Sequence, residues 1–146
     1  MKYLFVFSFL LLAACATPSV GFDVKEIKTN EFLGAGYEHL EGKIFSIFCG
    51  GNGYANYEYV QASCMRNTAA FVDGKGYKYF TMLSKNGDTD KTPSGYVSNG
   101  VYVPTTIIKH SQSYIIFLLE QNQIKKANNY YKVSDYYVPE SQIKSD

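Results

Sequence analysis

The sequence contains no tryptophan and only two histidines among its 146 residues. The histidines, His39 and His110, stand far apart, and neither falls in a metal-binding spacing or a recognisable nucleophile motif. Asp88-Thr89-Asp90 lacks the spaced ligands and the closing Glu of a calcium loop. The sequence therefore predicts a protein that is not an enzyme and that holds no metal and no dissociable cofactor.

An excess of one charge is also missing, because fourteen Lys and Arg residues face thirteen Asp and Glu residues. Binding to nucleic acid needs a basic excess or a basic stripe, and Lys125-Lys126 is the only adjacent basic pair. After the first fifteen residues the longest strongly apolar run is 115–119, far below the roughly 20 residues of a membrane span. We therefore expect no nucleic-acid partner and no later spanning segment.

The first fifteen residues follow the pattern of an export signal. Lys2 supplies a positive start, residues 3–12 are almost entirely apolar, and Ala13 and Ala14 precede Cys15. This Leu-Ala-Ala-Cys ending resembles the lipobox of bacterial lipoproteins. The resemblance implies that residues 1–14 are a signal peptide, that the Ala14–Cys15 bond is cut, and that Cys15 carries a diacylglycerol and an amino-terminal acyl chain such as palmitate. A secreted protein with a chance cysteine and an uncleaved anchor are the alternatives.

The predicted acyl chains make membrane lipid the first expected partner of the chain. One chain binds only marginally, whereas two or three on Cys15 hold a protein to a bilayer almost permanently. Ala16 follows the cysteine where Asp would signal retention at the inner membrane in enterobacterial lipoproteins. Similarity to that rule implies the periplasmic leaflet of the outer membrane, with the inner membrane and surface exposure as alternatives. The turn-forming composition of residues 15–23 predicts a short tether.

Residues 24–120 predict a single α+β domain that begins with an ambiguous stretch up to Phe32. Strands at 35–41 and 43–49 flank Gly42 as a hairpin, and the second strand has an apolar face of Phe45, Ile47 and Cys49. A helix is predicted over residues 55–72, with glycines at its end. Its apolar stripe consists of Tyr57, Val60, Cys64, Thr68 and Phe71.

Three further strands are predicted at 77–84, 101–109 and 113–119. Gly87, Pro93, Gly95 and Gly100 indicate a long polar loop over 85–100, and residues 110–112 join the last two strands. The resulting order, ββαβββ, predicts a mostly antiparallel sheet of about five strands with one main helix on one face. Residues 121–146 form a polar and then aromatic tail, in which a short helix is one option.

Cys49 and Cys64 remain as a pair once Cys15 is assigned to lipid. An oxidising periplasm permits a disulfide, which would close a loop of about 15 residues and stabilise the fold by about 3 kcal/mol. A helix that runs back over its own strand would instead bring Cys64 closer to Phe45. A disulfide, two buried thiols, and a redox or metal pair therefore stay open as alternatives.

Gly51-Asn52-Gly53 stands between the predicted strand and helix. A helix N-terminus after a glycine-rich turn is suited to anions, but the third glycine of a dinucleotide site and the Lys of a P-loop are missing. We therefore interpret these three residues as a structural turn. The tyrosines, fourteen in all, suit either half-buried strands or a docking face.

Three motifs occur in a recognisable order: Gly36-Tyr37-Glu38, Gly51-Asn52-Gly53-Tyr54 and Gly76-Tyr77-Lys78-Tyr79-Phe80. With the lipobox, they resemble a family of small, uncharacterised proteobacterial lipoproteins. That family has a strand, a Gly-Asn-Gly turn, a helix and a Gly-Tyr-aromatic strand, and it usually carries Arg where Gly50 stands here. The resemblance implies the same fold and anchoring, and it implies no activity.

The sequence as a whole predicts a non-enzymatic docking or structural module that faces the periplasm. Such a module would be an accessory subunit of an envelope assembly or a sensor, with an envelope protein as its partner. The alternative is a binding module for a small ligand, either a glycan or a lipid head group. A concave pocket lined by Tyr79, Tyr102 and Tyr114 would favour that alternative.

Overall fold

The computed structural model describes residues 25–26 and 35–139. The predicted signal peptide, Cys15 and the tether at 15–23 lie outside the described residues. The strands are β1 (Lys25–Glu26), β2 (Ala35–Glu41), β3 (Ile44–Gly50), β4 (Tyr79–Ser98), β5 (Val101–Leu119) and β6 (Tyr131–Lys132). The helix α1 (Tyr57–Gly74) joins β3 to β4, and 3₁₀ turns follow at Ile124–Lys126 and Val133–Asp135.

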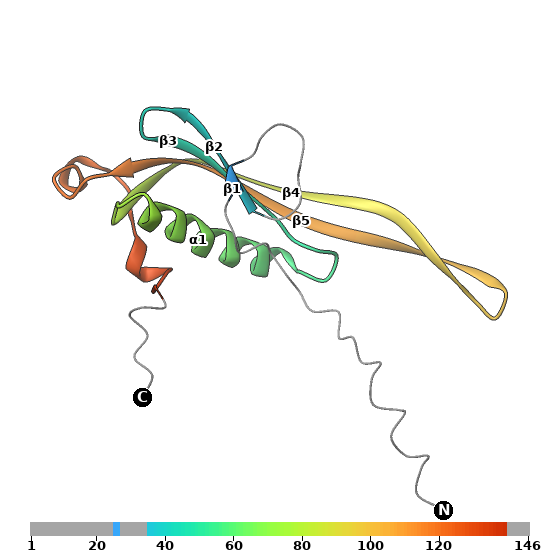
Figure 1. The fold of residues 1–146 in the computed structure, drawn as a ribbon. Coiled ribbons are helices and arrows are strands. Elements are labelled where there is room, and N and C mark those ends of the chain that lie inside the picture. Colours follow the sequence, from blue (N-terminus) through green and yellow to red (C-terminus); the bar gives the residue numbers. More distant parts are fainter. Residues whose placement is uncertain (1–24, 27–34, 140–146) are drawn as a thin grey trace, which may run out of the picture.

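The strands form one six-stranded sheet in the order β1-β2-β3-β5-β4-β6. All neighbouring strands are antiparallel except β1 and β2, which pair in parallel. Helix α1 lies across one face of the sheet (Figure 1). The predicted α+β class, a mostly antiparallel sheet with one main helix on one face, is confirmed.

The core lies between α1 and the strands β3 and β5. Alternation places the predicted apolar face of β3 against the helix, and Tyr114, Ile116 and Leu118 of β5 continue that face. The helix stripe is buried from Val60 to Phe71, whereas Tyr57 at its start is partly exposed. The side chain of Asn56 accepts a hydrogen bond from the Tyr59 N–H at 2.8 Å and so caps the helix.

The predicted loop at 85–100 and the predicted joint at 110–112 are both wrong. β4 continues through this region to Ser98, and β5 runs without a break from Val101 to Leu119. Asn99 and Gly100 make the turn with φ angles of 50° and 77°. Positive φ at both central residues is the conformation that a two-residue hairpin favours, so one long hairpin replaces a strand, a loop and two short strands.

The segment after Glu120 returns to the domain. β6 pairs with the start of β4, and the Tyr131 ring stacks on Phe80 with 5.3 Å between ring centroids. Val133 is buried in the core beside α1. Residues 131–135 therefore belong to the packed domain, and two short 3₁₀ turns stand where the sequence left a short helix as an option.

Candidate functional site

The outer part of the β4–β5 hairpin projects well past the rest of the domain (Figure 1). Pairing between β3 and β5 ends at Gly50 and Ser111, so among the described strands only β4 and β5 pair beyond that level. We call residues 92–108, which include the turn, the arm. Residues 92–108 include no Asp, Glu, Lys, Arg or His.

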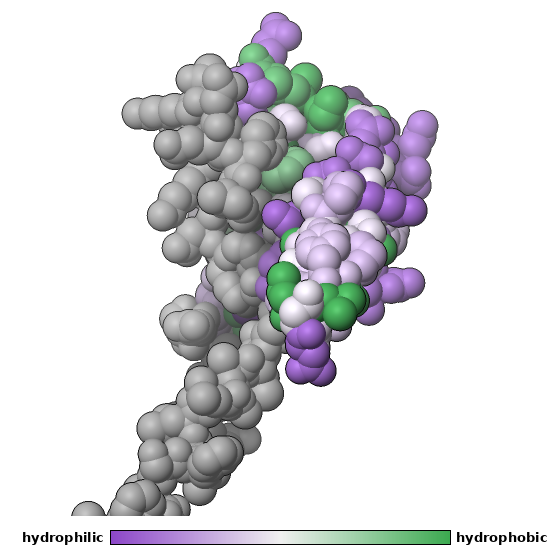
Figure 2. Space-filling model, turned by 90° about the vertical axis from the view of Figure 1, so that its right-hand side faces the viewer, coloured by the Kyte–Doolittle hydropathy of each residue, from purple (hydrophilic) through white to green (hydrophobic). Residues whose placement is uncertain are grey.

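The arm is apolar near its turn. Its exposed large apolar residues are Tyr96 (57%), Val97 (70%), Val101 (64%), Tyr102 (62%), Ile107 (39%) and Ile108 (41%). Figure 2 shows the domain from the turn end of the arm. Pale and green side chains gather at this end, which faces the viewer. Isolated exposed apolar residues are ordinary, but a contiguous group of this kind indicates a contact surface.

The apolar residues occupy both faces of the arm. Tyr96 lies opposite Val103, and Val97 lies opposite Tyr102 in the next pair toward the turn. Residues opposite one another share a face, and successive pairs alternate between faces. Each face therefore presents one tyrosine and one valine at nearly the same distance from the turn.

The two backbone edges of the arm are each protected by a proline. In a two-residue hairpin Ser98 and Val101 form the closing hydrogen-bonded pair, so the pairs that contain Pro104 and Pro93 are of the non-hydrogen-bonded kind. Backbone nitrogens at such positions point away from the partner strand, and proline has no N–H to offer there. An added strand would find a donor missing on either edge, so side chains form the contact surface of the arm.

The base of the arm is braced by the start of α1. The Gly51 N–H donates to the His110 carbonyl at 2.9 Å, and the ring of Tyr57 meets the His110 ring edge-on, with centroids 5.9 Å apart. His110 Nδ1 lies 2.9 Å from Thr89 Oγ1 across the hairpin. A Cβ at Gly87 would come within 2.5 Å of the Tyr57 hydroxyl, so a larger residue there would have to displace the end of the Tyr57 side chain. These contacts hold the arm in place where the core ends.

The glycines of the Gly51-Asn52-Gly53 turn allow a close approach between α1, the turn and β5. A Cβ at Gly51 would lie 2.5 Å from Val60 Cγ2, and one at Gly53 would lie 2.9 Å from Ile107 Cγ2. Real Cβ atoms essentially never make contacts this short; Val60 is buried in α1, and Ile107 lies at the inner end of the arm. The geometry thus gives both glycines a packing role.

Asn52 uses the backbone donors that an anion would need. Its Oδ1 accepts from the N–H groups of Tyr54 at 3.2 Å and Ala55 at 3.1 Å. Glu58 adds a negative charge in the first turn of the helix, which opposes a bound anion. The arrangement supports the structural turn and disfavours an anion site.

Cys49 and Cys64 form a disulfide between β3 and α1, with 5.5 Å between their Cα atoms. Both residues are fully buried. Phe71, two turns after Cys64, contacts Phe45 at 5.1 Å between ring centroids, so the helix does cross its own strand but begins at the cysteine end of it. Of the three alternatives, the structure contains the disulfide, which contributes about 3 kcal/mol by loop closure.

Tyr79, Tyr102 and Tyr114 do not line a common pocket. Tyr114 is buried beneath α1, where its hydroxyl donates to the Gln61 carbonyl at 3.3 Å. Burial raises the pKa of Tyr114 to about 12. Tyr79 lies on the opposite face of the sheet, with its ring against Tyr130, and Tyr102 lies on the arm.

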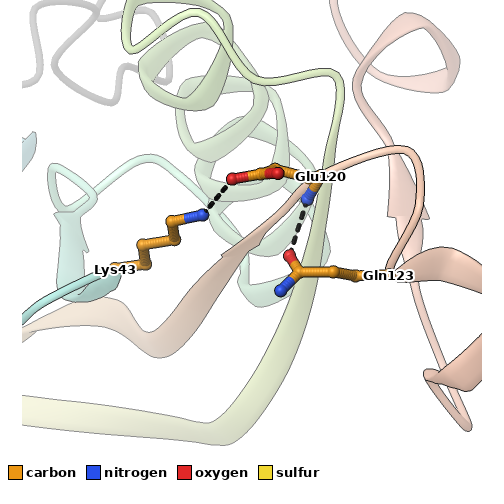
Figure 3. A network of polar contacts seen from close by, with 3 residues as sticks. All are labelled: Lys43, Glu120 and Gln123. Carbon is orange, nitrogen blue, oxygen red and sulfur yellow. Dashed lines mark hydrogen bonds and ion pairs between the residues drawn. The ribbon is translucent and has the colours of Figure 1, made fainter.

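A shallow concavity of about 490 Å³ lies at the other end of the hairpin. It is lined by Gly76, Tyr77, Lys78, Tyr79, Leu119, Glu120 and Gln121. Lys43 Nζ bonds Glu120 Oε1 at 2.5 Å and lies over the Tyr77 ring, and the Glu120 N–H donates to Gln123 Oε1 at 2.9 Å (Figure 3). The hydrogen bond with Glu120 raises the pKa of Lys43 above its ordinary value of 10.5.

The two histidines make separate contacts. His39 Nε2 lies 3.0 Å from the Gly42 carbonyl, and its ring stacks on Phe45, whereas His110 belongs to the arm base. Within the described residues, no three His, Cys, Asp or Glu side chains gather as a metal site. No helix of the described part is long and apolar enough to cross a membrane.

No family model matches the chain, and no curated protein or solved structure is significantly similar to it. The resemblance to small proteobacterial lipoproteins therefore stays a prediction from motifs. The most distinctive feature of the described residues is the arm.

Proposed function

We propose that the protein is a non-enzymatic docking module of the bacterial cell envelope. In this proposal acylated Cys15 holds the domain at the periplasmic leaflet of the outer membrane, and the arm contacts another envelope component. The module would serve as an accessory subunit or a sensor. The single observation that carries the proposal is the uncharged arm, which projects from the core and exposes tyrosine and valine side chains on both faces.

The size of the apolar surface supports a weak contact that an anchor would strengthen. Tyr96, Val97, Val101 and Tyr102 are each more than half exposed, and full burial of such a side chain contributes about 1.5–3 kcal/mol. After association costs, four of them would support roughly micromolar to millimolar binding. The anchor would keep the arm beside its envelope partner, which raises the effective concentration and makes such a contact sufficient.

Photo-crosslinking in native membranes tests this proposal. A photoreactive phenylalanine analogue replaces Tyr102 on the arm or, as a control, Tyr54, which is 65% exposed and lies off the arm. We expect adducts with an envelope component from position 102 and few from position 54. The variant Cys15→Ser, which removes the acyl chains, should lose the adduct.

Equal adduct yields at the two positions would contradict a specific role for the arm. Adducts at position 102 that persist unchanged in Cys15→Ser would contradict the role of the anchor.

A second candidate is binding of a glycan or lipid head group in the concavity beside Lys43. The specific observation in its favour is the combination of Tyr77, Tyr79 and Glu120 around one hollow, because aromatic faces with a few polar groups suit such ligands. Titration with soluble glycan fragments, followed by NMR, should shift the resonances of Tyr77 and leave those of Tyr102 unchanged. Unchanged spectra at saturating glycan would dismiss this candidate.

A further inference from the structure

We infer that the turn end of the arm inserts into the headgroup region of the bilayer that holds Cys15. This inference rests on the proposed function, because it assumes the lipid anchor, and it goes further by assigning lipid as the occupant of the arm end. Val101 would be the deepest apolar side chain, followed by the pair Val97 and Tyr102 and then by Tyr96.

The distribution of apolar side chains favours lipid over a protein surface. A protein partner that docks on one face of a two-stranded ribbon leaves the other face in water, but here both faces carry one tyrosine and one valine. Lipid surrounds an inserted ribbon and covers both faces together. Tyr96 and Tyr102 stand in adjacent pairs on opposite faces, so their depths differ by only about 3.3 Å, and tyrosine is enriched at membrane interfaces.

The chemistry of the arm sets the depth of insertion. Ser98 and Asn99 at the turn are polar, and unpaired backbone groups on the edges are costly in hydrocarbon. Insertion therefore stops at a depth of about 5–10 Å, near the acyl boundary. At about 3.3 Å per residue, this depth corresponds to two or three residues of each strand. Lys91 and Lys109 are the first charged residues along the two strands, and at roughly 20 Å or more from the turn they remain in water.

The length of chain before the domain matches the length of the arm. Lys25 pairs with Gly36, and the ladder through Phe48 reaches Ser113 at the base of the hairpin. From Ser113 to Val101 the strand extends about 40 Å. Ten peptide links join Cys15 to Lys25, and they span at most about 35 Å. Cys15 therefore reaches to within about 5 Å of the level of Val101 when this stretch of chain is extended along the arm. The anchor and the arm end meet one membrane surface when the arm end lies about 5–10 Å below that surface.

The absence of tryptophan provides the test. Tyr102→Trp places a tryptophan on the arm, and Tyr54→Trp places one at an exposed control position off the arm. In each variant the new residue is the only tryptophan of the sequence. The lipidated chain is reconstituted in vesicles of phosphatidylethanolamine and phosphatidylglycerol that include phospholipid with brominated acyl chains. Flotation reports the anchor, and tryptophan emission reports the position of the arm.

We expect the protein to float with the vesicles. The emission of Trp at position 102 should shift to shorter wavelength and be quenched by the brominated lipid, while the emission at position 54 stays unchanged. Val97→Ser and Val101→Ser, added to Tyr102→Trp, should each lower partitioning of the arm end about tenfold, without loss of flotation.

Three results would overturn the inference. Flotation without quenching at position 102 would remove the lipid contact and leave the proposed anchor intact. A failure to float would remove the anchor itself, and the proposed function with it. A shift of the tryptophan emission at position 102 to shorter wavelength that occurs without vesicles and grows with protein concentration would assign the arm end to a second copy of the chain.

Discussion

The inner and outer halves of the β4–β5 hairpin have similar residues and opposite environments. In the inner half, Phe80, Tyr114 and Ile116 are buried against α1 and its neighbours, whereas Tyr102 and Ile108 in the outer half are exposed. Both halves belong to the same two strands and share one continuous ladder apart from a bulge near Leu83. The comparison teaches that two strands can continue well past the elements that cover them, and that burial depends on this cover.

Element lengths explain why the outer half is uncovered. The helix has 18 residues and, at 1.5 Å per residue, is about 27 Å long. β5 has 19 residues and, at about 3.3 Å per residue, extends roughly 63 Å. A single helix therefore covers less than half of the hairpin, and β3, with seven residues, ends at a similar level. The arm projects because these covering elements are too short for it.

The sharpest test of the comparison is one substitution made in each half. Ile116 and Ile108 lie on the same face of β5, but Ile116 is fully buried and Ile108 is 41% exposed. Ile116→Ala should lower the free energy of unfolding by about 2–5 kcal/mol, because it leaves a cavity. Ile108→Ala should change it by about 0.5 kcal/mol or less. Urea unfolding followed by circular dichroism measures both, and equal losses would show that the arm is part of the core.

An intermediate effect is expected from the buried hydroxyl of the inner half. Burial raises the pKa of Tyr114 to about 12, while an unfolded tyrosine ionises near pH 10. The folded state therefore disfavours the ionised form, and stability present below pH 10 is lost as the pH rises toward 12. The loss should reach roughly 2 kcal/mol.

The variant Tyr114→Phe provides the control for this pH dependence. It lacks the ionisable group and should lose less stability than the wild type between pH 10 and pH 12. Urea unfolding across this range measures both proteins. Parallel stability curves would contradict the assignment of the alkaline loss to Tyr114.

The smallest effect is expected at the turn of the arm. Gly100 and Gly42 both have positive φ, and a Cβ at either position would meet nothing within 4 Å, so only backbone strain distinguishes Gly from Ala there. Each change to Ala should cost about 1 kcal/mol. Gly42→Ala, in the β2–β3 hairpin of the core, should lower global stability. Gly100→Ala should instead speed amide exchange about fivefold in the arm alone.

Hydrogen exchange monitored residue by residue distinguishes these two outcomes. Faster exchange throughout the core in Gly100→Ala would mean that the arm and the core unfold as one unit, which would end the distinction between the two halves.

Much of the core was predictable because its local signals agree. Alternation along β3, the spacing of three and four from Val60 to Phe71, and the glycines that end α1 each indicate the element that forms. Gly76, with a φ of 83°, follows the helix as a capping glycine does. These features depend on neighbours in the chain, so they are visible without a structure.

The arm was missed because its glycines and prolines have tertiary roles. Gly95 admits the Tyr102 ring, which crosses it so closely that a Cβ would lie 2.3 Å from the hydroxyl, and Pro93 protects an edge. Read locally, both residues indicate a loop. The signal that would have corrected this was Asn99-Gly100 between Val97 and Val101, because Asn-Gly flanked by alternating apolar residues is a strong hairpin signal.

Tertiary packing decided which of the predicted site residues come together. The sequence left the state of Cys49 and Cys64 open, and the crossing of α1 over β3 brings them into one disulfide. The three tyrosines whose common pocket would have favoured ligand binding lie under the helix, on the opposite face and on the arm. They are apart because strand alternation and register depend on a bulge near Leu83 and on a turn that joins two distant segments.

The sequence by itself determined the kinds of elements in the core, the turns at Gly42 and Gly76, and the uncharged composition of residues 92–108. Only the tertiary structure decided that this uncharged segment is a projecting ribbon with apolar side chains on both faces. The physical reason is that periodicity shows which side of a strand is apolar, whereas exposure depends on how far α1 and β3 extend. β3 ends and α1 begins near the base of the arm, so neither element covers it.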